Sequence, residues 1–234
     1  MKEYYTNINR DLLSVVPINA GSVIEFGCGA GAFGSRYKEF NPNCLYFGVE
    51  NEPEPSAAAS HRLDQVFAAN AEHESTLQKI REDLSRRSLS HVDALVYGDV
   101  IEHLVDPWKT LRNHLTLLQP GGTISICVPN SQHWSLSLNL AIGSFEYADS
   151  GLLDRTHLRF FTRSSLERLL AELGVSIVKL APRKFGKVPN FVKRLSTELA
   201  KSANLDASAV LALPRCLPRD WDWRFCCWPG YTPR

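Results

Sequence analysis

The chain has 234 residues, of which 44% are hydrophobic and 22% are charged, and its formal net charge is +1 at pH 7. This composition is typical of a globular domain, and the near-zero charge excludes a global attraction to nucleic acid or to an acidic membrane. The sequence shows no apolar leader and no apolar run near the roughly 20 residues that cross a bilayer. Its six cysteines form no CxxC pair, which favours a reducing compartment. We therefore expect a cytoplasmic protein without a transmembrane segment.

Strand-like apolar segments alternate with helical segments along most of the chain. The predicted strands are, in order, Ser22–Phe26, Cys44–Glu50, Gln65–Ala68, Val92–Val100, Thr123–Val128 and Val175–Leu180. The predicted helices include Gly31–Phe40, Ser56–Leu63, Ser75–Arg87 and Arg163–Leu173. A further helix is predicted to begin at the cap Asp106 and to carry Trp108, Leu111, Leu115 and Leu118 on one face. This alternation predicts an α/β fold, a Rossmann-like, doubly wound and mostly parallel sheet with helices on both faces. Ligands bind such sheets at the carboxyl ends of the strands, so the residues just after each strand form the candidate site.

Two segments interrupt the alternation and set the expected domain boundaries. The connection Asn130–Thr162 is long for a compact domain, and long connections of this kind often act as lids. The segment Arg183–Arg219 is rich in lysine and arginine. We therefore predict a core over residues 1–181 with a lid-like loop at 130–162, and a basic extension over residues 182–234 that packs on the core.

The glycine-rich segment IEFGCGAGAFG, Ile24–Gly34, predicts a ligand-binding turn directly after the first strand. Its last six residues match the G-x-G-x-x-G pattern of dinucleotide-binding proteins, and Glu50 follows at about the 20-residue distance where an acid binds ribose hydroxyls. Glu25 argues against a dinucleotide, because its carboxylate would repel a pyrophosphate. It suits a ligand with an ammonium group, such as S-adenosylmethionine (SAM). The alternative is a tight turn without a ligand, and that alternative requires Glu25 to be an exposed surface acid, because burial of an unpaired carboxylate is costly.

Several segments occur in the same order as in the class I SAM-dependent methyltransferases and resemble their motifs. They are VIEFGCGAGAFG, FGVE and VDALVYGDVIEHLVDPWKTLRNHLTLLQPGGTISICVPN. The resemblance extends over Tyr4–Leu180. It implies a seven-stranded sheet, with Arg224–Trp228 as the candidate for its last strand. It also implies SAM as the cofactor and S-adenosylhomocysteine as the product.

The same resemblance assigns the cofactor contacts. Glu25 would contact the methionine ammonium group, and Gly27 and Gly29 would let the backbone approach the ligand closely. Glu50, with Asn51 beside it, would contact the ribose. Asn70 and Ala71 would contact the adenine, and Asp99 would lie near the transferred methyl group.

Two histidines are the candidate catalytic residues. Methyl transfer needs no enzyme nucleophile, but a base can remove the proton of a hydroxyl acceptor. His103 follows the fourth strand in GDVIEHL, and His157 lies in LLDRTHLRFFTRSS at the end of the long loop. In the alternative interpretation, the Glu-His pair is structural and the second segment is a salt-bridged loop packed by Leu158, Phe160 and Phe161.

A metal site is a further possibility. Asp99, Glu102 and His103 form a D-x-x-E-H pattern. It resembles the E-x-x-E-H pattern of small-RNA 2′-O-methyltransferases and ubiquinone-pathway O-methyltransferases, which implies a divalent ion held by carboxylates and histidines, with His157 as a further ligand. Such mixed ligands suit Mg²⁺ or Mn²⁺. Because aspartate is one methylene shorter than glutamate, the metal ligands stay undetermined.

The segment DRTHLRFFT resembles one in bacterial methyltransferases associated with cell-surface polysaccharides and other sugar-modifying pathways. The resemblance implies O-methylation of a sugar or small hydroxylated metabolite, with a small molecule or glycan as the partner. The net charge argues against a nucleic-acid acceptor, although Arg183–Arg219 is basic. The alternatives are a metal-assisted RNA 2′-O-methyltransferase, an NAD-dependent oxidoreductase and a non-catalytic SAM-binding subunit. The acceptor atom and the oligomeric state stay open.

Overall fold

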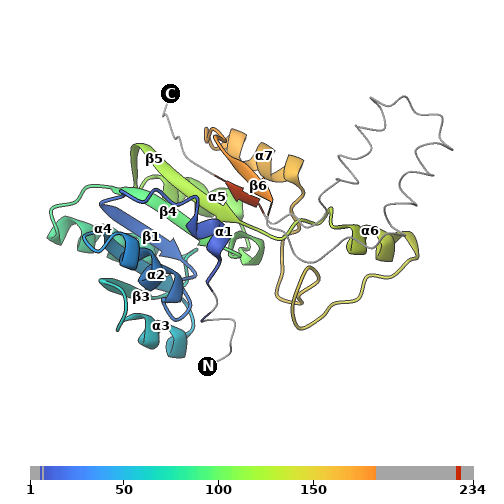
Figure 1. Ribbon diagram of the computed structural model, residues 1–234, viewed down its shortest axis with the longest axis horizontal. Helices are drawn as coiled ribbons and strands as arrows, with labels where there is room; N and C mark the ends of the chain where they lie inside the picture. The colour runs from blue at the N-terminus through green and yellow to red at the C-terminus, as the bar shows by residue number, and fades with distance from the viewer. Residues whose placement is uncertain (1–5, 7, 183–224, 228–234) are drawn as a thin grey trace.

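A computed structural model of the chain describes residues 6, 8–182 and 225–227 (Figure 1). Its centre is a parallel sheet in the order β3-β2-β1-β4-β5. The bounds of these strands are β1 Ser22–Phe26, β2 Leu45–Glu50, β3 Gln65–Ala68, β4 Val92–Gly98 and β5 Leu118–Cys127. Two short strands, β7 Phe225–Cys227 and β6 Leu180–Pro182, continue the sheet beyond β5 with antiparallel pairings. The strand order reverses between β1 and β4, so their carboxyl ends mark the switch point at which ligands bind in such sheets.

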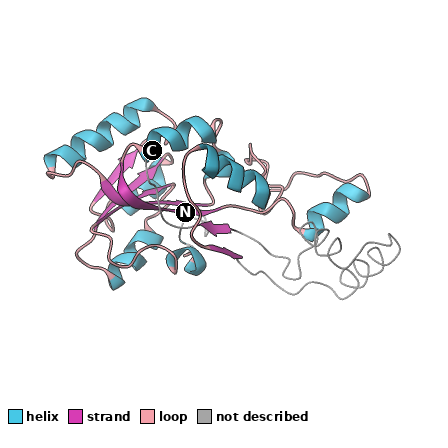
Figure 2. Ribbon diagram, turned by 90° about the horizontal axis from the view of Figure 1, so that it is seen from above, coloured by secondary structure: helices cyan, strands magenta, loops and turns pink. Residues whose placement is uncertain are grey.

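Helices cover both faces of the sheet, as Figure 2 shows. On one face, α4 Glu74–Arg86, α5 Pro107–Leu115 and α7 Arg163–Glu172 contribute buried side chains to the larger core cluster. On the other face, α1 Arg10–Leu13, α2 Ala32–Phe40 and α3 Pro53–Ala59 pack in a second cluster. The described part of the chain also contains the short 3-10 helix η2 Ile101–His103 and the helix α6 Trp134–Ala141, and α6 projects to one side of the sheet (Figure 1).

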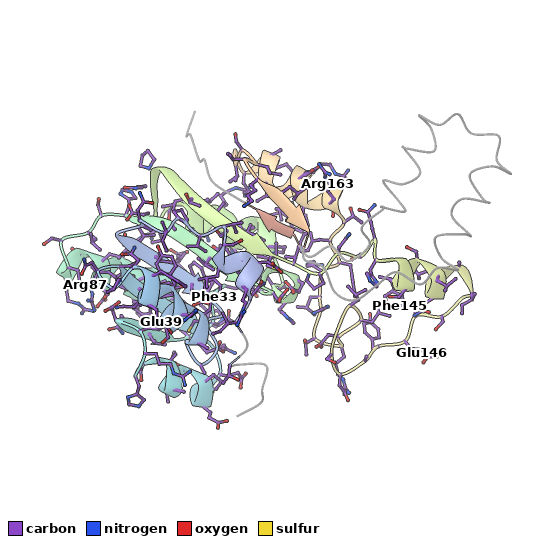
Figure 3. The ribbon with its side chains drawn as sticks, in the orientation of Figure 1. Phe33, Glu39, Arg87, Phe145, Glu146 and Arg163 are labelled. Carbon is purple, nitrogen blue, oxygen red and sulfur yellow. The ribbon has the colours of Figure 1, made fainter. Side chains whose placement is uncertain are left out.

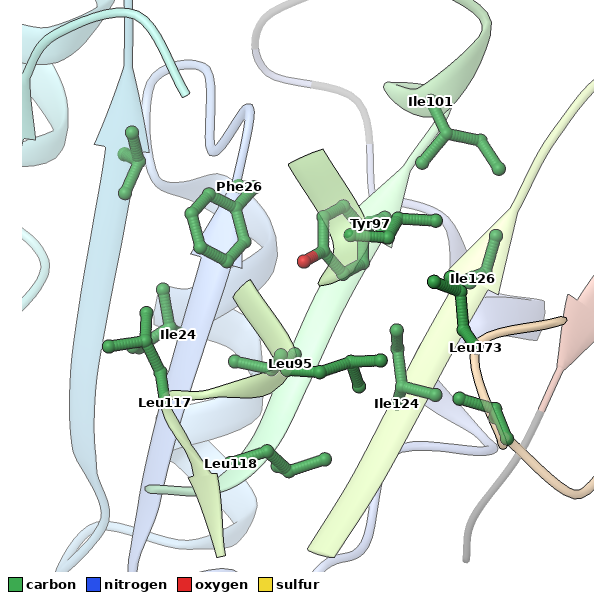
Figure 4. Close-up of a cluster of buried hydrophobic side chains, with 14 of the residues drawn as sticks. Ile24, Phe26, Leu95, Tyr97, Ile101, Leu117, Leu118, Ile124, Ile126 and Leu173 are labelled. Carbon is green, nitrogen blue, oxygen red and sulfur yellow. The ribbon is translucent and has the colours of Figure 1, made fainter. Parts of the chain in front are cut away.

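The larger core follows from the apolar pattern of the strands and of α5. Neighbouring strands bring Ile24, Leu95 and Ile124 into register in this core (Figure 4). All five residues of β1 are buried, as expected of a central strand that is covered on both faces, and they include the polar residues Ser22 and Glu25. The cap predicted for α5 is confirmed, because Asp106 accepts a hydrogen bond from the Lys109 amide at 3.0 Å. This helix is therefore fixed at its start beside the end of β4.

The predicted α/β Rossmann-like fold is confirmed, and several element boundaries were wrong. The helix predicted over Ser56–Leu63 is α3 Pro53–Ala59, and the strand predicted over Thr123–Val128 begins earlier, at Leu118. Residues 175–179 form no strand, although a strand was predicted over Val175–Leu180. The Val175 amide instead closes the end of α7 by donating to Leu170 O at 2.9 Å, and β6 begins only at Leu180. Leu118 was predicted on the face of α5, but that helix ends before it and Leu118 pairs with Val92 as the first residue of β5.

The predicted domain organisation stays a prediction. Of the basic extension predicted over 182–234, all but residues 182 and 225–227 lie outside the described residues. The short strand β7 falls within the predicted last strand. Within 130–162, α6 is followed by a segment that returns to the sheet, where Ser131 N donates to Phe161 O at 2.8 Å. None of the described helices has the length and apolar character needed to cross a membrane.

Candidate functional site

The glycine turn joins β1 to α2 at the switch point. Gly27, Gly29 and Gly31 have φ of +69°, +53° and +75°, which are left-handed values that strain any residue with a side chain. A Cβ on Gly27 would also lie 2.5 Å from Val100 Cγ2. Gly27 is exposed, so a ligand can approach the backbone of the turn.

The last glycine of the pattern serves packing. Gly34 lies in α2, where a Cβ would be 2.4 Å from Tyr46 Cε1 and 2.7 Å from Leu63 Cδ2. It therefore lets α2 pack closely on β2, which is the role that the third glycine has in dinucleotide-binding turns. The G-x-G-x-x-G spacing here thus has a structural cause that requires no pyrophosphate.

Glu25 is buried in the middle of β1, with 5% of its surface exposed. Its Oε2 accepts a hydrogen bond from the Tyr46 hydroxyl at 3.1 Å. Burial raises the pKa of Glu25 to about 8; the Tyr46 hydroxyl opposes this rise and the negative charge of Glu50 adds to it. The alternative in which Glu25 is an exposed surface acid was wrong. A carboxyl group in this environment is stabilised in its charged form by a cation bound beside it.

Glu50 ends β2 and faces the glycine turn. Its Oε2 accepts from Gly29 N at 2.8 Å, its Oε1 accepts from Glu52 N at 2.9 Å, and it is 7% exposed. Each carboxylate oxygen has two lone pairs, so both oxygens can accept one more hydrogen bond from a pair of neighbouring hydroxyls. Asn51, the next residue, is exposed. The structure therefore brings Glu50 and the glycine turn together, as the motif order predicts.

The predicted adenine segment follows β3. Asn70 Oδ1 accepts from Glu72 N at 2.8 Å, so this side-chain oxygen shapes the loop. Ala71 is partly buried against the larger core, and its carbonyl accepts from His114 Nε2 at 2.9 Å. Sequence reasoning assigned no role to His114, which lies on α5 within the long segment that resembles the family motifs.

Asp99 follows β4 in a left-handed conformation, with φ of +55°. Its amide donates to Cys127 O at 2.9 Å, which fixes the turn at the end of β4 against the end of β5. Residues other than glycine seldom adopt this conformation, and those that do cluster at functional sites. Asp99 therefore lies at the switch point, beside the strand that leads into the glycine turn.

The structure brings the two candidate histidines together. His103, on η2, and His157, on the returning segment, have ring centroids 4.8 Å apart. His103 Nδ1 lies 3.1 Å from Thr156 O, and His157 Nδ1 lies 3.2 Å from Leu152 O. A carbonyl only accepts, so both Nδ1 atoms carry hydrogen, and in the neutral form of either ring the Nε2 atom has a basic lone pair. Burial, with a contribution from His103, lowers the pKa of His157, so its ring is neutral at pH 7.

The same place offers a group of potential metal ligands. One ligand atom from each of Glu102, His103 and His157 lies within 4.8 Å of the others, and Glu102 is 1% exposed. Neutral imidazoles with fixed Nδ1–H groups and a carboxylate can hold a divalent ion. Among the described residues, Asp99 is not part of this group, so the predicted D-x-x-E-H set is brought together only in part.

The returning segment is tied to η2 through its backbone. The amides of Leu158 and Arg159 both donate to Glu102 O at 2.9 Å. Arg155 pairs with Asp149, so the predicted salt bridge within the loop exists. The predicted packing by three apolar residues was wrong for two of them, because Phe161 is buried whereas Leu158 and Phe160 are exposed.

A group of exposed aromatic rings extends from the histidine pair, and sequence reasoning missed it. Phe160 lies 6.4 Å from His157 and 5.9 Å from Phe145, and Phe145 lies 5.5 Å from Tyr147, between ring centroids. Figure 3 shows Phe145 on the projecting segment beyond α6. These residues have no regular spacing, so only the return of the chain brings them together.

Comparison with known families decides between the ligands that this geometry admits. A sequence profile of the family described as "Methyltransferase domain" matches residues 1–180, which contain the glycine turn, both acidic residues and both histidines. The chain belongs to the class I SAM-dependent methyltransferases. The predicted family and its cofactor SAM are confirmed, and the NAD-dependent oxidoreductase alternative was wrong.

Curated relatives of this methyltransferase include the "Ubiquinone biosynthesis O-methyltransferase" of Cupriavidus pinatubonensis. It is 26% identical over 161 residues, covering 68% of this chain and 61% of the relative. The human mitochondrial protein of the same name is 24% identical over 164 residues, covering 69% and 43%. A "Trans-aconitate 2-methyltransferase" of Azoarcus is 29% identical over 128 residues, covering 54% and 46%. The chain thus spans roughly half the length of the curated relatives it matches.

Solved methyltransferase structures share the fold. A SAM-dependent methyltransferase from Archaeoglobus fulgidus superposes with a TM-score of 0.57 at 20% identity, covering 91% of this chain and 87% of the other. An O-methyltransferase from a trans-AT PKS multienzyme of Brevibacillus brevis, in complex with S-adenosyl-L-homocysteine, superposes with a TM-score of 0.56 at 13% identity, covering 96% and 71%.

Proposed function

We propose that this methyltransferase transfers the methyl group of SAM to a hydroxyl oxygen of a sugar or another small hydroxylated metabolite. The observation that carries the proposal is the pair of His103 and His157 beside the switch point. Both Nδ1–H groups are directed at carbonyls, so either Nε2 can take a proton from a hydroxyl. A base is needed for a hydroxyl acceptor because the proton must leave as the oxygen is methylated.

In the proposed complex, SAM lies across the glycine turn. Glu25 would hold its ammonium group, Glu50 would accept from its ribose hydroxyls, and Asn70 and Ala71 would lie at its adenine. Asp99, at the end of β4, would lie near the transferred methyl group. Support for this placement comes from the burial of both carboxylates at the switch point and from the hydrogen bond of the Gly29 amide to Glu50.

The reaction needs orientation and one proton transfer. The acceptor oxygen attacks the methyl carbon in line with the C–S bond, so the O–C bond forms as the C–S bond breaks. The sulfonium becomes the neutral thioether of S-adenosylhomocysteine. The hydroxyl proton passes to a histidine Nε2, which later releases it to water. The protein contributes near-attack geometry and the base.

The choice of a small acceptor rests on the relatives and on the aromatic rings. One kind of relative is named for the biosynthesis of ubiquinone and another for trans-aconitate. Ubiquinone and trans-aconitate are both small molecules. The exposed rings of Phe145, Tyr147 and Phe160 adjoin His157. Binding sites for small molecules are lined mainly by apolar and aromatic groups, and the C–H face of a sugar packs on such rings.

An acceptor screen with methyl-labelled SAM tests the proposal. The protein is incubated with labelled SAM and, in separate reactions, monosaccharides, nucleotide sugars, phenols, small carboxylic acids and tRNA. We expect label in an ether-linked methyl group of a sugar or small hydroxylated compound. Label only in tRNA would support the RNA alternative, and label only in a carboxylate ester or an amine would overturn O-methylation of a hydroxyl. S-adenosylhomocysteine binding without transfer to any pool would favour the non-catalytic subunit.

Cofactor binding at pH 7 is expected to release protons. Glu25, with a pKa of about 8, carries its proton in the ligand-free protein, and an ammonium group beside it favours the ionised form. The affinity for S-adenosylhomocysteine should therefore rise with pH toward about 8 and fall again at higher pH, where the ligand's own ammonium group loses its proton. Calorimetry in two buffers with different ionisation enthalpies measures the release. The Glu25→Gln variant cannot ionise at this position, so it should bind the ligand more weakly and give equal heats in the two buffers. Equal heats for the unchanged protein would instead refute the contact between Glu25 and the ammonium group.

Chelation separates the proposed base from the metal-assisted alternative. If His103 and His157 act as bases, turnover in EDTA should equal turnover without it, because their Nε2 atoms are available only when no ion is bound. If Glu102 and the two histidines hold an ion, EDTA should abolish turnover, and Mg²⁺ or Mn²⁺ should restore it. After the second result, Glu102, His103 and His157 would be assigned to holding the ion, which would supply Lewis-acid activation of the acceptor hydroxyl in place of the proposed base.

A further inference from the structure

We infer that His114 is a positioning residue that holds the adenine-side loop and the glycine turn in their relative places. The inference rests on the proposed SAM site. His114 lies in α5 and is none of the proposed cofactor contacts, so its proposed role is exerted through the residues it contacts.

Both ring nitrogens of His114 are engaged in the protein interior. The residue is 0% exposed, with Nε2 2.9 Å from Ala71 O and Nδ1 2.9 Å from the Tyr97 hydroxyl oxygen. Because the Ala71 carbonyl only accepts, Nε2 carries the hydrogen and Nδ1 accepts from the Tyr97 hydroxyl. Burial lowers the pKa of His114 to about 4, against the opposing effects of the Ala71 carbonyl and of Glu72, so this single neutral tautomer persists at neutral pH.

The ring also meets the strand that leads into the glycine turn. His114 stacks on Phe26 with ring centroids 3.8 Å apart and planes 6° from parallel. Phe26 directly precedes Gly27, and Tyr97 lies on β4 shortly before Asp99. One buried side chain thus contacts the ends of β1 and β4 and the loop after β3, which are three of the four places that the proposed cofactor touches.

A second contact fixes the same loop to the same helix. Glu72 Oε1 accepts from Asp106 N at 3.0 Å and from Thr110 Oγ1 at 3.4 Å. The loop is therefore docked on α5 at Ala71 from the buried side and at Glu72 from the more exposed side. Without His114, the Ala71 carbonyl would lose its donor in the interior, and a buried group without a partner drives local rearrangement.

The test compares substitutions that keep or remove these contacts. His114→Phe preserves a ring against Phe26 and removes both hydrogen bonds. We expect its affinity for S-adenosylhomocysteine and for 5′-methylthioadenosine to fall by the same factor, about tenfold or more, because the loop contacts the adenosine half that both ligands share. Amide hydrogen exchange of residues 70–76 should also become faster in the ligand-free protein.

Leu111→Ala is the matched control, since it removes a buried core side chain from the same helix. It should lower the melting temperature, yet leave affinity and loop exchange unchanged at a temperature where the protein is folded. Equal losses of affinity in Leu111→Ala and His114→Phe would show that His114 is merely structural, and wild-type affinity in His114→Phe would also overturn the inference.

Tyr97→Phe provides a second variant if His114→Phe does not fold. It removes only the hydroxyl that donates to His114 Nδ1 and should give a smaller affinity loss with the same faster loop exchange. Wild-type affinity and exchange in Tyr97→Phe would then overturn the inference. If the unchanged protein binds no S-adenosylhomocysteine, the proposed SAM site and the inference both fail. If it binds and the variants bind equally well, only the inference fails.

Discussion

Replacing Glu50 with alanine is expected to weaken S-adenosylhomocysteine binding by at least about a hundredfold. In the proposed complex, the substitution removes two hydrogen bonds from ribose hydroxyls to a carboxylate, each worth about 1.5–3 kcal/mol. About 1.4 kcal/mol corresponds to a tenfold change in affinity, so the two losses together exceed a factor of about one hundred. The amides of Gly29 and Glu52 also lose their acceptor, which loosens the turn that the ligand contacts. Calorimetric titration measures the effect.

Two further variants show whether the loss is specific. Glu52→Ala removes the same charge from an exposed neighbour and should bind within about twofold of the unchanged protein. Glu50→Gln keeps one accepting oxygen but turns an amide NH₂ toward one of the two backbone donors, so its loss should be intermediate. Near-normal binding by Glu50→Ala would refute the ribose contact.

Replacing His103 with alanine is expected to lower turnover by about 10²–10⁴ while S-adenosylhomocysteine affinity stays unchanged, because the base acts only in the chemical step. The structure supports this separation, since His103 lies on η2 beside His157, whereas the proposed contacts with the ammonium group, the ribose and the adenine lie on β1 and on the turns after β1, β2 and β3. Initial rates with the acceptor found by the labelled-SAM screen give the first quantity, and calorimetry gives the second.

His91→Ala is the matched control, because His91 is exposed and lies at the opposite end of β4. The pH profile adds a test for the second ring. The lowered pKa of His157 means that the ring is protonated only below its ordinary range, so a rate that depends on it should fall only at pH below about 6.5 and stay level above it. Unchanged turnover in His103→Ala would remove His103 from the mechanism, and unchanged turnover in the double variant with His157→Ala would remove the pair.

The parallel core was predictable because each strand is a short apolar run between turn residues, and β1 has the predicted bounds. The far edge of the sheet was not. Val175–Leu180 alternates like a strand, but a strand needs a partner, and β7 from near the end of the chain pairs only from Leu180 onward. A local pattern carries no information about a partner that distant in sequence.

The cofactor side of the site was predictable because Glu25, Glu50 and the glycines occur at family spacing. Two features depended on packing instead. Glu25 is buried because it lies on a central strand of the sheet. From the sequence alone, the cost of burying an unpaired carboxylate predicts an exposed Glu25 if no ligand binds beside it. The contact of His114 with Ala71 and Phe26 joins elements far apart in sequence, and the amphipathic pattern of α5 marks only its leucines.

The central claim is that the glycine turn between Glu25 and Glu50 binds the methyl donor. The most direct measurement is a thermal-unfolding comparison of the protein alone, with S-adenosylhomocysteine and with NADH. A ligand at one hundred times its dissociation constant adds about 2.7 kcal/mol to the free energy of unfolding, which raises the melting temperature measurably. We predict stabilisation by S-adenosylhomocysteine and none by NADH. Stabilisation by NADH alone would contradict the assignment of Glu25 to an ammonium group and, with it, the proposed site.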